Sequence, residues 1–181
     1  MIIFASEMFT NTILFIMEQS IISDFFKAEP KLSVSMKEFI KWLGKNAPSD
    51  IDSIVHEIHD DVFEEVDCLQ CANCCKTVGP AIKDVDIDRL SKFLRIKPSK
   101  LIDDYLIMDE DFDYIFRNHP CPFLMTDNYC SVYDSRPKAC REYPHTDRRR
   151  VMQIINLHKK NIEYCPAVYE VFTRLKKKFG K

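Results

Sequence analysis

Cysteine is the residue type whose number and spacing in this sequence could support chemistry. The chain contains eight cysteines: Cys68, Cys71, Cys74, Cys75, Cys121, Cys130, Cys140 and Cys165. The first four lie in the segment C-L-Q-C-A-N-C-C. Thiols separated by two residues can bind one ion, because a tight turn brings their sulfur atoms to the same side. This spacing is typical of tetrahedral zinc sites and of iron–sulfur clusters.

A loop with three such thiols needs a further ligand from elsewhere in the chain. In the bacterial ferredoxin spacing that distant cysteine is followed by proline, and Cys165-Pro166 and Cys121-Pro122 both have this form. A closed zinc site that only stabilises the fold, and a set of thiols without metal, stay open as alternatives. We expect three thiols of this segment and one later thiol to ligate one centre: Cys68, Cys71 and Cys74 with Cys140 or Cys165. The other thiols would complete that centre or form a second one: Cys75, Cys121 and Cys130.

The motifs around these cysteines resemble a known family. C-x-x-C-x-x-C-C at 68–75, C-P-F-L at 121–124 and C-S-V-Y-D-S-R-P-x-x-C-R-x-Y-P at 130–144 occur in order at fitting separations. Together they resemble the YkgJ-like cysteine-cluster family over about residues 66–170. The resemblance implies a zinc- or iron-chelating domain without an established general activity. Cys165-Pro166 fits the trailing cysteine of the family, although alanine follows where glycine is expected.

Three functions are compatible with these residues. The leading one is metal binding through an iron–sulfur cluster of the [4Fe–4S] type, in electron transfer or redox sensing. The second is a non-catalytic zinc module for structure or protein binding. The third, implied by a resemblance to flagellin lysine methylases, is a component of a protein-lysine methylase. The chain has 3 glycines and no G-x-G-x-x-G loop, so the sequence leaves an enzymatic role undecided. In any of these sites, Arg136 or Arg141 could offset the negative charge of thiolates.

Composition limits the class of protein and its partners. The chain has 181 residues, of which 46% are hydrophobic and 30% charged, with a net charge of −2. These values are typical of a globular chain and argue against a nucleic-acid partner. Basic residues are nevertheless in excess from 136 to 181. That excess could bind an anionic partner, neutralise a thiolate centre, or complement the acidic helix near residue 60.

The N-terminal segment bears on the compartment. Residues 1–17 are apolar but lack the basic region and cleavage site of a signal peptide, and they are too short to span a membrane. We expect a buried helix there, or a translation start at Met8 or Met17. The expected location is the cytoplasm, where thiols stay reduced and bind metals rather than forming disulfides.

The pattern of apolar residues predicts the elements that position the cysteines. We expect an α+β fold: a mainly helical small domain with a short β-hairpin, organised around a cysteine-ligated metal centre. Residues 1–65 would form a helical extension, and 66–181 the cysteine-cluster domain. Helices are predicted at 33–45, from 51 to 62, at 84–94 with Phe93 inside, at 99–106, at 136–141 and from 166 onward, and two strands within 121–133 around a turn at 126–128.

Overall fold

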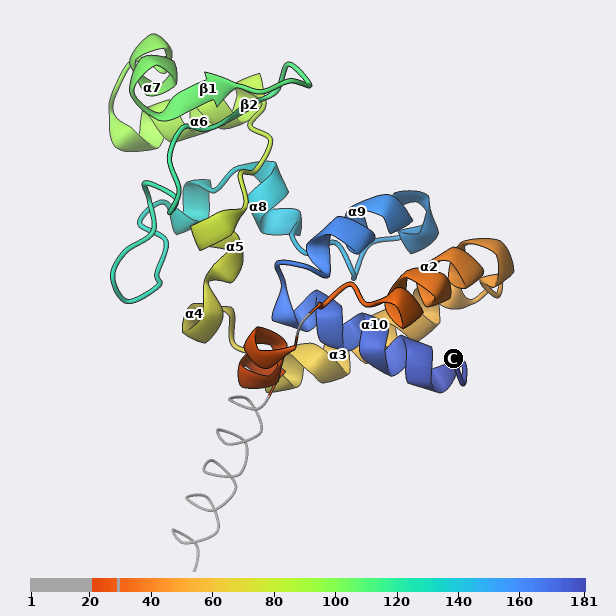
Figure 1. Cartoon of the computed structure of the whole chain (residues 1–181). Coiled ribbons are helices and arrows are strands. Elements are labelled where there is room, and N and C mark those ends of the chain that lie inside the picture. Colours follow the sequence, from red (N-terminus) through yellow and green to blue (C-terminus); the bar gives the residue numbers. More distant parts are fainter. Residues whose placement is uncertain (1–20, 29) are drawn as a thin grey trace, which may run out of the picture. The chain divides into compact units, whose positions relative to one another are not determined.

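The computed structural model describes residues 21–28 and 30–181 (Figure 1). The expectations for residues 1–17 lie outside this described part. The chain divides into two compact units, one of 1–67 with 144–181 and one of 68–143. We call them the terminal unit and the central unit. The prediction that residues 66–181 form the metal-binding domain, with 1–65 as an extension, stays a prediction.

The terminal unit is helical and combines the two ends of the chain. Residues 21–27 are helical. The other elements are α2 (Val34–Asn46), α3 (Ile51–Glu65), the 3₁₀ helix η2 (Val151–Ile154), α9 (Ile155–Asn161) and α10 (Pro166–Lys178). Helix α10 packs against α3 and α2, as Figure 1 shows. The apolar stripes of these three helices fill the core, with Leu43, Val62, Val168, Val171 and Leu175 fully buried.

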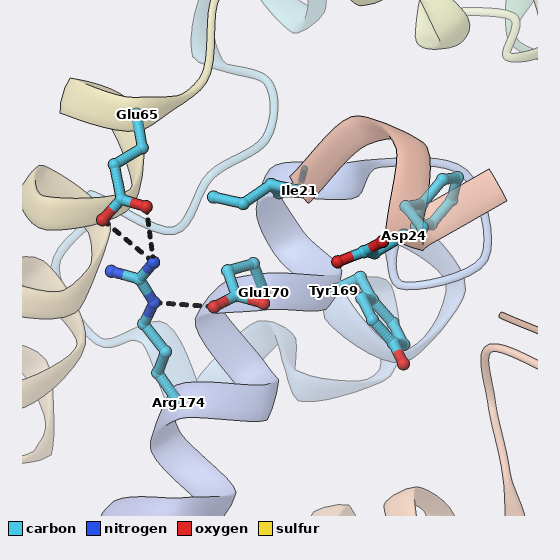
Figure 2. A pocket seen from close by; sticks show the side chains of 7 residues that line it. Ile21, Asp24, Glu65, Tyr169, Glu170 and Arg174 are labelled. Atoms are coloured by element: carbon cyan, nitrogen blue, oxygen red, sulfur yellow. Dashed lines mark hydrogen bonds and ion pairs between the residues drawn. The ribbon is translucent and has the colours of Figure 1, made fainter. Parts of the chain in front are cut away.

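Ion pairs join α10 to α3 beside this core. The Arg174 guanidinium donates to both carboxylate oxygens of Glu65 at 3.0 Å and to Glu170 at 2.7 Å (Figure 2). Lys178 Nζ lies 3.3 Å from the carboxylate of Glu57. Part of the basic C-terminal excess therefore complements the acidic helix α3, which was one of the alternatives open from the sequence.

The central unit carries seven of the cysteines on short elements. It contains α4 (Cys68–Cys71), α5 (Asn73–Thr77), α6 (Asp84–Leu94), α7 (Pro98–Tyr105), β1 (Leu106–Met108), β2 (Tyr114–Phe116), η1 (Tyr133–Ser135) and α8 (Lys138–Glu142). Strands β1 and β2 are antiparallel, with Leu106 opposite Phe116 and Met108 opposite Tyr114. A second core includes Ile82, Leu90, Leu101, Leu106 and Phe116.

The fold is mainly helical with one small hairpin among the described residues, which confirms the coarse fold prediction. The hairpin itself was predicted in the wrong segment. Residues 121–133 form a loop with a single isolated bridge between Leu124 and Cys130, because backbone hydrogen bonds within turns order the loop rather than strand pairing. Phe93 is half exposed rather than inside, since the buried stripe of α6 runs through Asp86 and Leu90. No helix within the described part of the chain has the length and apolar character needed to cross a membrane.

Candidate metal centre

The C-x-x-C-x-x-C-C segment forms two short helices instead of one open loop. Helix α4 holds Cys68 and Cys71, and α5 holds Cys74 and Cys75. Between them Ala72 adopts a left-handed conformation with φ of 47°, which reverses the chain direction. The Ala72 N–H donates to the carbonyl of Cys68 at 2.8 Å. Because Cys74 and Cys75 are adjacent on α5, their side chains leave the helix in different directions.

Cys75 is the member of this segment that lies among the later cysteines. Its carbonyl accepts a hydrogen bond from the Cys121 N–H at 2.8 Å. Leu124 pairs with Cys130 in an isolated bridge. The Leu124 N–H also donates to the Cys121 carbonyl at 3.0 Å, so Leu124 connects the backbones of Cys121 and Cys130. Each thiol of this group interacts electrostatically with the other three. We call this group the coupled set: Cys75, Cys121, Cys130 and Cys140.

The pKa of Cys75 is lowered, whereas the pKa values of the other three thiols of the coupled set are raised. A hydrogen bond from the Cys74 thiol, with a smaller contribution from the positive charges of Arg136 and Lys76, lowers the pKa of Cys75 to about 7. Burial raises the pKa of Cys121 to about 11 and that of Cys140 to about 12. Burial also raises the pKa of Cys130. Near neutral pH, Cys75 is therefore the nucleophilic member of the set.

Arg136 is a cation whose charge acts on the thiols of the coupled set. Its guanidinium lies 3.5 Å from the ring centroid of Tyr133, and its Nε donates to the Tyr133 carbonyl at 2.8 Å. Its charge lowers the pKa of Cys75 and opposes the rise at Cys130 and Cys140. This is the charge-offsetting role expected from the sequence. Tyr133 itself is 42% exposed, so it supports Arg136 rather than shielding the thiols from water.

Two residues outside the cysteine motifs, Asp86 and Arg89, form hydrogen bonds with the backbone near Arg136 and Cys140. The Asp86 carboxylate is 1% exposed and accepts from Arg89 at 2.5 Å, from the Lys138 N–H at 3.0 Å and from the Lys83 N–H at 3.2 Å. Burial alone would raise the pKa of Asp86, but these hydrogen bonds outweigh it and lower the pKa below its usual value. A signal was present in the sequence, since Asp86 lies four residues before Leu90 in the apolar stripe of α6.

Of the remaining cysteines, Cys74 is hydrogen-bonded to Cys75, and Cys71 interacts electrostatically with Cys75. Cys68 is exposed and Cys71 is partly buried, and burial raises the pKa of Cys71. Cys165 belongs to the terminal unit, where it packs against the hydrophobic core. The ligand group expected from spacing, Cys68, Cys71 and Cys74 with Cys140 or Cys165, stays a prediction. Among the residues described, no three His, Cys, Asp or Glu side chains converge closely enough to hold a single ion.

The histidines of the terminal unit are partly or fully buried. His56 and His59 are partly buried on α3 rather than fully exposed. His56 Nε2 lies 3.0 Å from the Arg148 carbonyl and His59 Nδ1 lies 2.7 Å from the Thr146 hydroxyl. His158 is completely buried in the core of the terminal unit.

Comparison with known proteins finds a family model that matches the region containing the cysteines. Residues 67–166 match the model of the family CxxCxxCC, described as a putative zinc- or iron-chelating domain. The matched region covers more than half of the chain and includes all eight cysteines. No curated protein and no solved structure gives a significant match.

Proposed function

The chain belongs to the CxxCxxCC family, and we propose that it binds a [4Fe–4S] cluster through the coupled set and serves in electron transfer or redox sensing. The observation that carries the proposal is the backbone contact between these segments: the Cys121 N–H donates to the Cys75 carbonyl at 2.8 Å, and Leu124 forms a bridge with Cys130. The charge of Cys140 acts together with those of the other three thiols. The donor set fits such a group, because thiolates are the soft ligands that iron–sulfur clusters and zinc take from proteins.

The four thiols of the coupled set come from separate positions along the chain. Cys75 lies on α5, Cys121 and Cys130 lie at the two ends of a loop, and Cys140 lies on α8. Four thiolates can ligate the four irons of a cluster or a single zinc ion, so the metal and sulfide content decides between them.

The residues around the coupled set would tune such a centre. When bound, the cluster would supply a one-electron redox couple. Arg136 would offset the negative charge of the ligands, because its charge favours the thiolate forms of Cys75, Cys130 and Cys140. Phe123, which is buried and stacks on Tyr105 with centroids 5.3 Å apart, would cover the adjoining core. Free thiols throughout the chain suit the reducing conditions of the cytoplasm, where we place the protein.

A zinc module is the second candidate, and one observation favours it. The fully described segment 117–132 has no helix or strand, and turn hydrogen bonds and one isolated bridge between Leu124 and Cys130 order it. A metal bound between Cys121, Cys130 and their neighbours would stabilise this loop without any redox role. Zinc would then act as a structural element of a binding module.

Metal and acid-labile sulfide content of anaerobically purified protein separate the two candidates. We expect about four irons and four sulfides per chain, with broad visible absorbance that dithionite bleaches. One or two zinc ions without sulfide would overturn the cluster and favour the zinc module.

Serine variants then test the ligand set. Single Cys75→Ser, Cys121→Ser, Cys130→Ser and Cys140→Ser variants should each lose most of the bound iron. Cys165→Ser and Cys68→Ser are matched controls that should retain it. Loss of iron from Cys165→Ser or Cys68→Ser, with retention in Cys75→Ser, would instead support the ligand group expected from spacing.

A further inference from the structure

Asp86 is a buried charge whose hydrogen bonds lead to the segment that carries Cys140. It lies on α6, and its Oδ1 accepts from the Lys138 N–H at 3.0 Å. Lys138 is the first residue of α8, on which Cys140 is the third. The carboxylate therefore fixes the point at which this short helix begins. The other oxygen accepts from the Lys83 N–H at 3.2 Å, which anchors the carboxylate to the start of its own helix.

Arg89, the ion-pair partner of Asp86, holds the other side of the same turn. Its guanidinium donates to Asp86 at 2.5 Å, to the Arg136 carbonyl at 2.6 Å and to the Ser135 carbonyl at 3.3 Å. The two side chains thus bind the backbone on both sides of Pro137. Five hydrogen bonds converge on this Asp86–Arg89 pair, whereas an isolated ion pair on the surface would restrain little.

We infer that Asp86 and Arg89 are positioning residues of the metal centre, which hold residues 135–138 so that the Cys140 thiol and the Arg136 guanidinium face the other thiols. Only the effect on metal affinity rests on the proposed function. The effect of Asp86 and Arg89 on the position of Cys140 exists with or without metal. Partners that orient ligand-bearing segments commonly change metal affinity about 10–100-fold when they are replaced.

The burial of Asp86 explains why it needs Arg89 as a partner. Removal of Arg89 leaves the Asp86 carboxylate charged, buried and without its ion-pair partner, which is unfavourable. The pair is therefore stable only while both side chains and the bound backbone groups keep their places. A loop that must present a ligand at a fixed position gains that fixed geometry from the pair.

Two variants and one matched control test the inference in the full-length chain. Asp86→Asn keeps the shape of the side chain but removes its charge. Arg89→Lys keeps the charge but cannot reach Asp86 and both carbonyls at once. Asp88→Asn is the control, because Asp88 is an exposed carboxylate on the same helix. If Asp86→Asn does not fold by circular dichroism, Arg89→Lys carries the test.

The first measurement needs no metal. Alkylation of each cysteine in the metal-free chain is followed by mass spectrometry, with Cys165 of the terminal unit as internal reference. We expect Cys140 to react several-fold faster in Asp86→Asn and Arg89→Lys than in wild type or Asp88→Asn, while the rate at Cys165 stays constant. Equal rates at Cys140 in all four proteins would overturn the inference even if the chain binds metal.

The second measurement separates positioning from general destabilisation. Affinity for Zn²⁺ is determined by chelator competition in the wild-type and Cys140→Ser backgrounds. Asp86→Asn should weaken binding about 10–100-fold in the wild-type background and less than about threefold when Cys140 is already serine. An equal loss in both backgrounds would mean that Asp86 acts on stability alone and would overturn the inference. Failure of the wild-type chain to bind Zn²⁺ or iron would overturn the proposed function, and the alkylation result would still decide the positioning role.

Discussion

His158 is a titratable side chain enclosed by the core of the terminal unit. It is 0% exposed, and neither ring nitrogen has a hydrogen-bond partner among the described residues. The ring of Phe172 on α10 lies 5.5 Å away, and His145 and Arg148 are the charged groups that act on it. Burial, together with these two positive groups, lowers the pKa of His158 to about 4. The imidazole is therefore neutral in the folded protein at neutral pH.

This buried imidazole should make the terminal unit sensitive to acid. The pKa in the folded state lies below the usual value of 6.5, so the unfolded chain binds the proton first as the pH falls. The contribution to stability is complete above pH 6.5, and about 3 kcal/mol of it is lost by pH 4. We expect His158→Leu to remove this part of the pH dependence and to leave the free energy of unfolding at pH 7 unchanged or higher.

Urea unfolding of the metal-free protein at pH 7 and pH 4.5 measures this effect. Trp42, the single tryptophan of the chain, lies on α2 and packs against the core of the terminal unit. Its fluorescence therefore reports the unfolding of the terminal unit. His119→Leu is the control, because His119 is exposed. Parallel loss of stability in wild type and His158→Leu on acidification would contradict the assignment to His158.

Cys75 should be the first thiol of the coupled set to react in the metal-free chain. With a pKa of about 7, about half of it is thiolate at pH 7, against roughly 1% for a thiol of pKa 9. The hydrogen bond from Cys74 is the largest cause of this shift, so Cys74→Ala should slow alkylation of Cys75 several-fold, and Arg136→Gln by a smaller factor. Alkylation rates of Cys75, measured against pH by mass spectrometry, should give a titration midpoint that is higher in Cys74→Ala and in Arg136→Gln than in wild type. An unchanged midpoint in Cys74→Ala would refute the hydrogen bond from Cys74 as the cause of the low pKa.

Among the elements, the start of η2 depends on one carboxylate. Asp52 on α3 accepts from the Arg150 N–H at 2.5 Å and from the Val151 N–H at 2.9 Å. These are backbone donors that the first turn of a helix cannot satisfy internally. Asp52→Ala should therefore lower the free energy of unfolding by about 1 kcal/mol, measured by Trp42 fluorescence in urea. Asp61→Ala, an exposed change on the same helix, should have a much smaller effect.

Elements with a strong apolar period were predictable from the sequence. Helix α2 begins after Ser33, whose hydroxyl accepts from the Met36 N–H at 3.3 Å as a capping serine should. Helix α10 begins at Pro166, as its position predicted. The hairpin was not predictable in the same way. Strands β1 and β2 have three residues each, too few for alternation to distinguish them from a loop that also alternates apolar residues with cysteines.

The residue types of the candidate site follow from the sequence, while its grouping of Cys68, Cys71 and Cys74 with Cys140 or Cys165 stays a prediction beside the coupled set. Spacing along the chain joins Cys74 to Cys68 and Cys71, whereas the fold couples Cys75 to the later thiols. The difference arises because a left-handed residue at Ala72 breaks the segment into two helices, and no spacing rule contains that break. Asp86 escaped notice for a similar reason, since its role depends on hydrogen bonds to residues about fifty positions later.

At the scale of the whole molecule, the two units have separate cores and different relations to the proposed metal. The core of the terminal unit is built by residues from both ends of the chain, including Leu43 of α2 and Phe172 of α10. The core of the central unit is built within 82–132. The coupled set lies entirely in the central unit. A ligand that binds only a folded unit stabilises that unit by mass action.

Removal of metal should therefore act on the central unit alone. At a metal concentration a thousand times the dissociation constant, the stabilisation is about 4 kcal/mol, and a chelator should abolish it. Hydrogen exchange at the β1–β2 hairpin, 106–116, should accelerate strongly after chelation, while exchange in α10 and the Trp42 transition should stay constant. The same change in Cys75→Ser protein should have no effect, because that variant has no metal to lose. Destabilisation of α10 together with the hairpin would contradict this prediction.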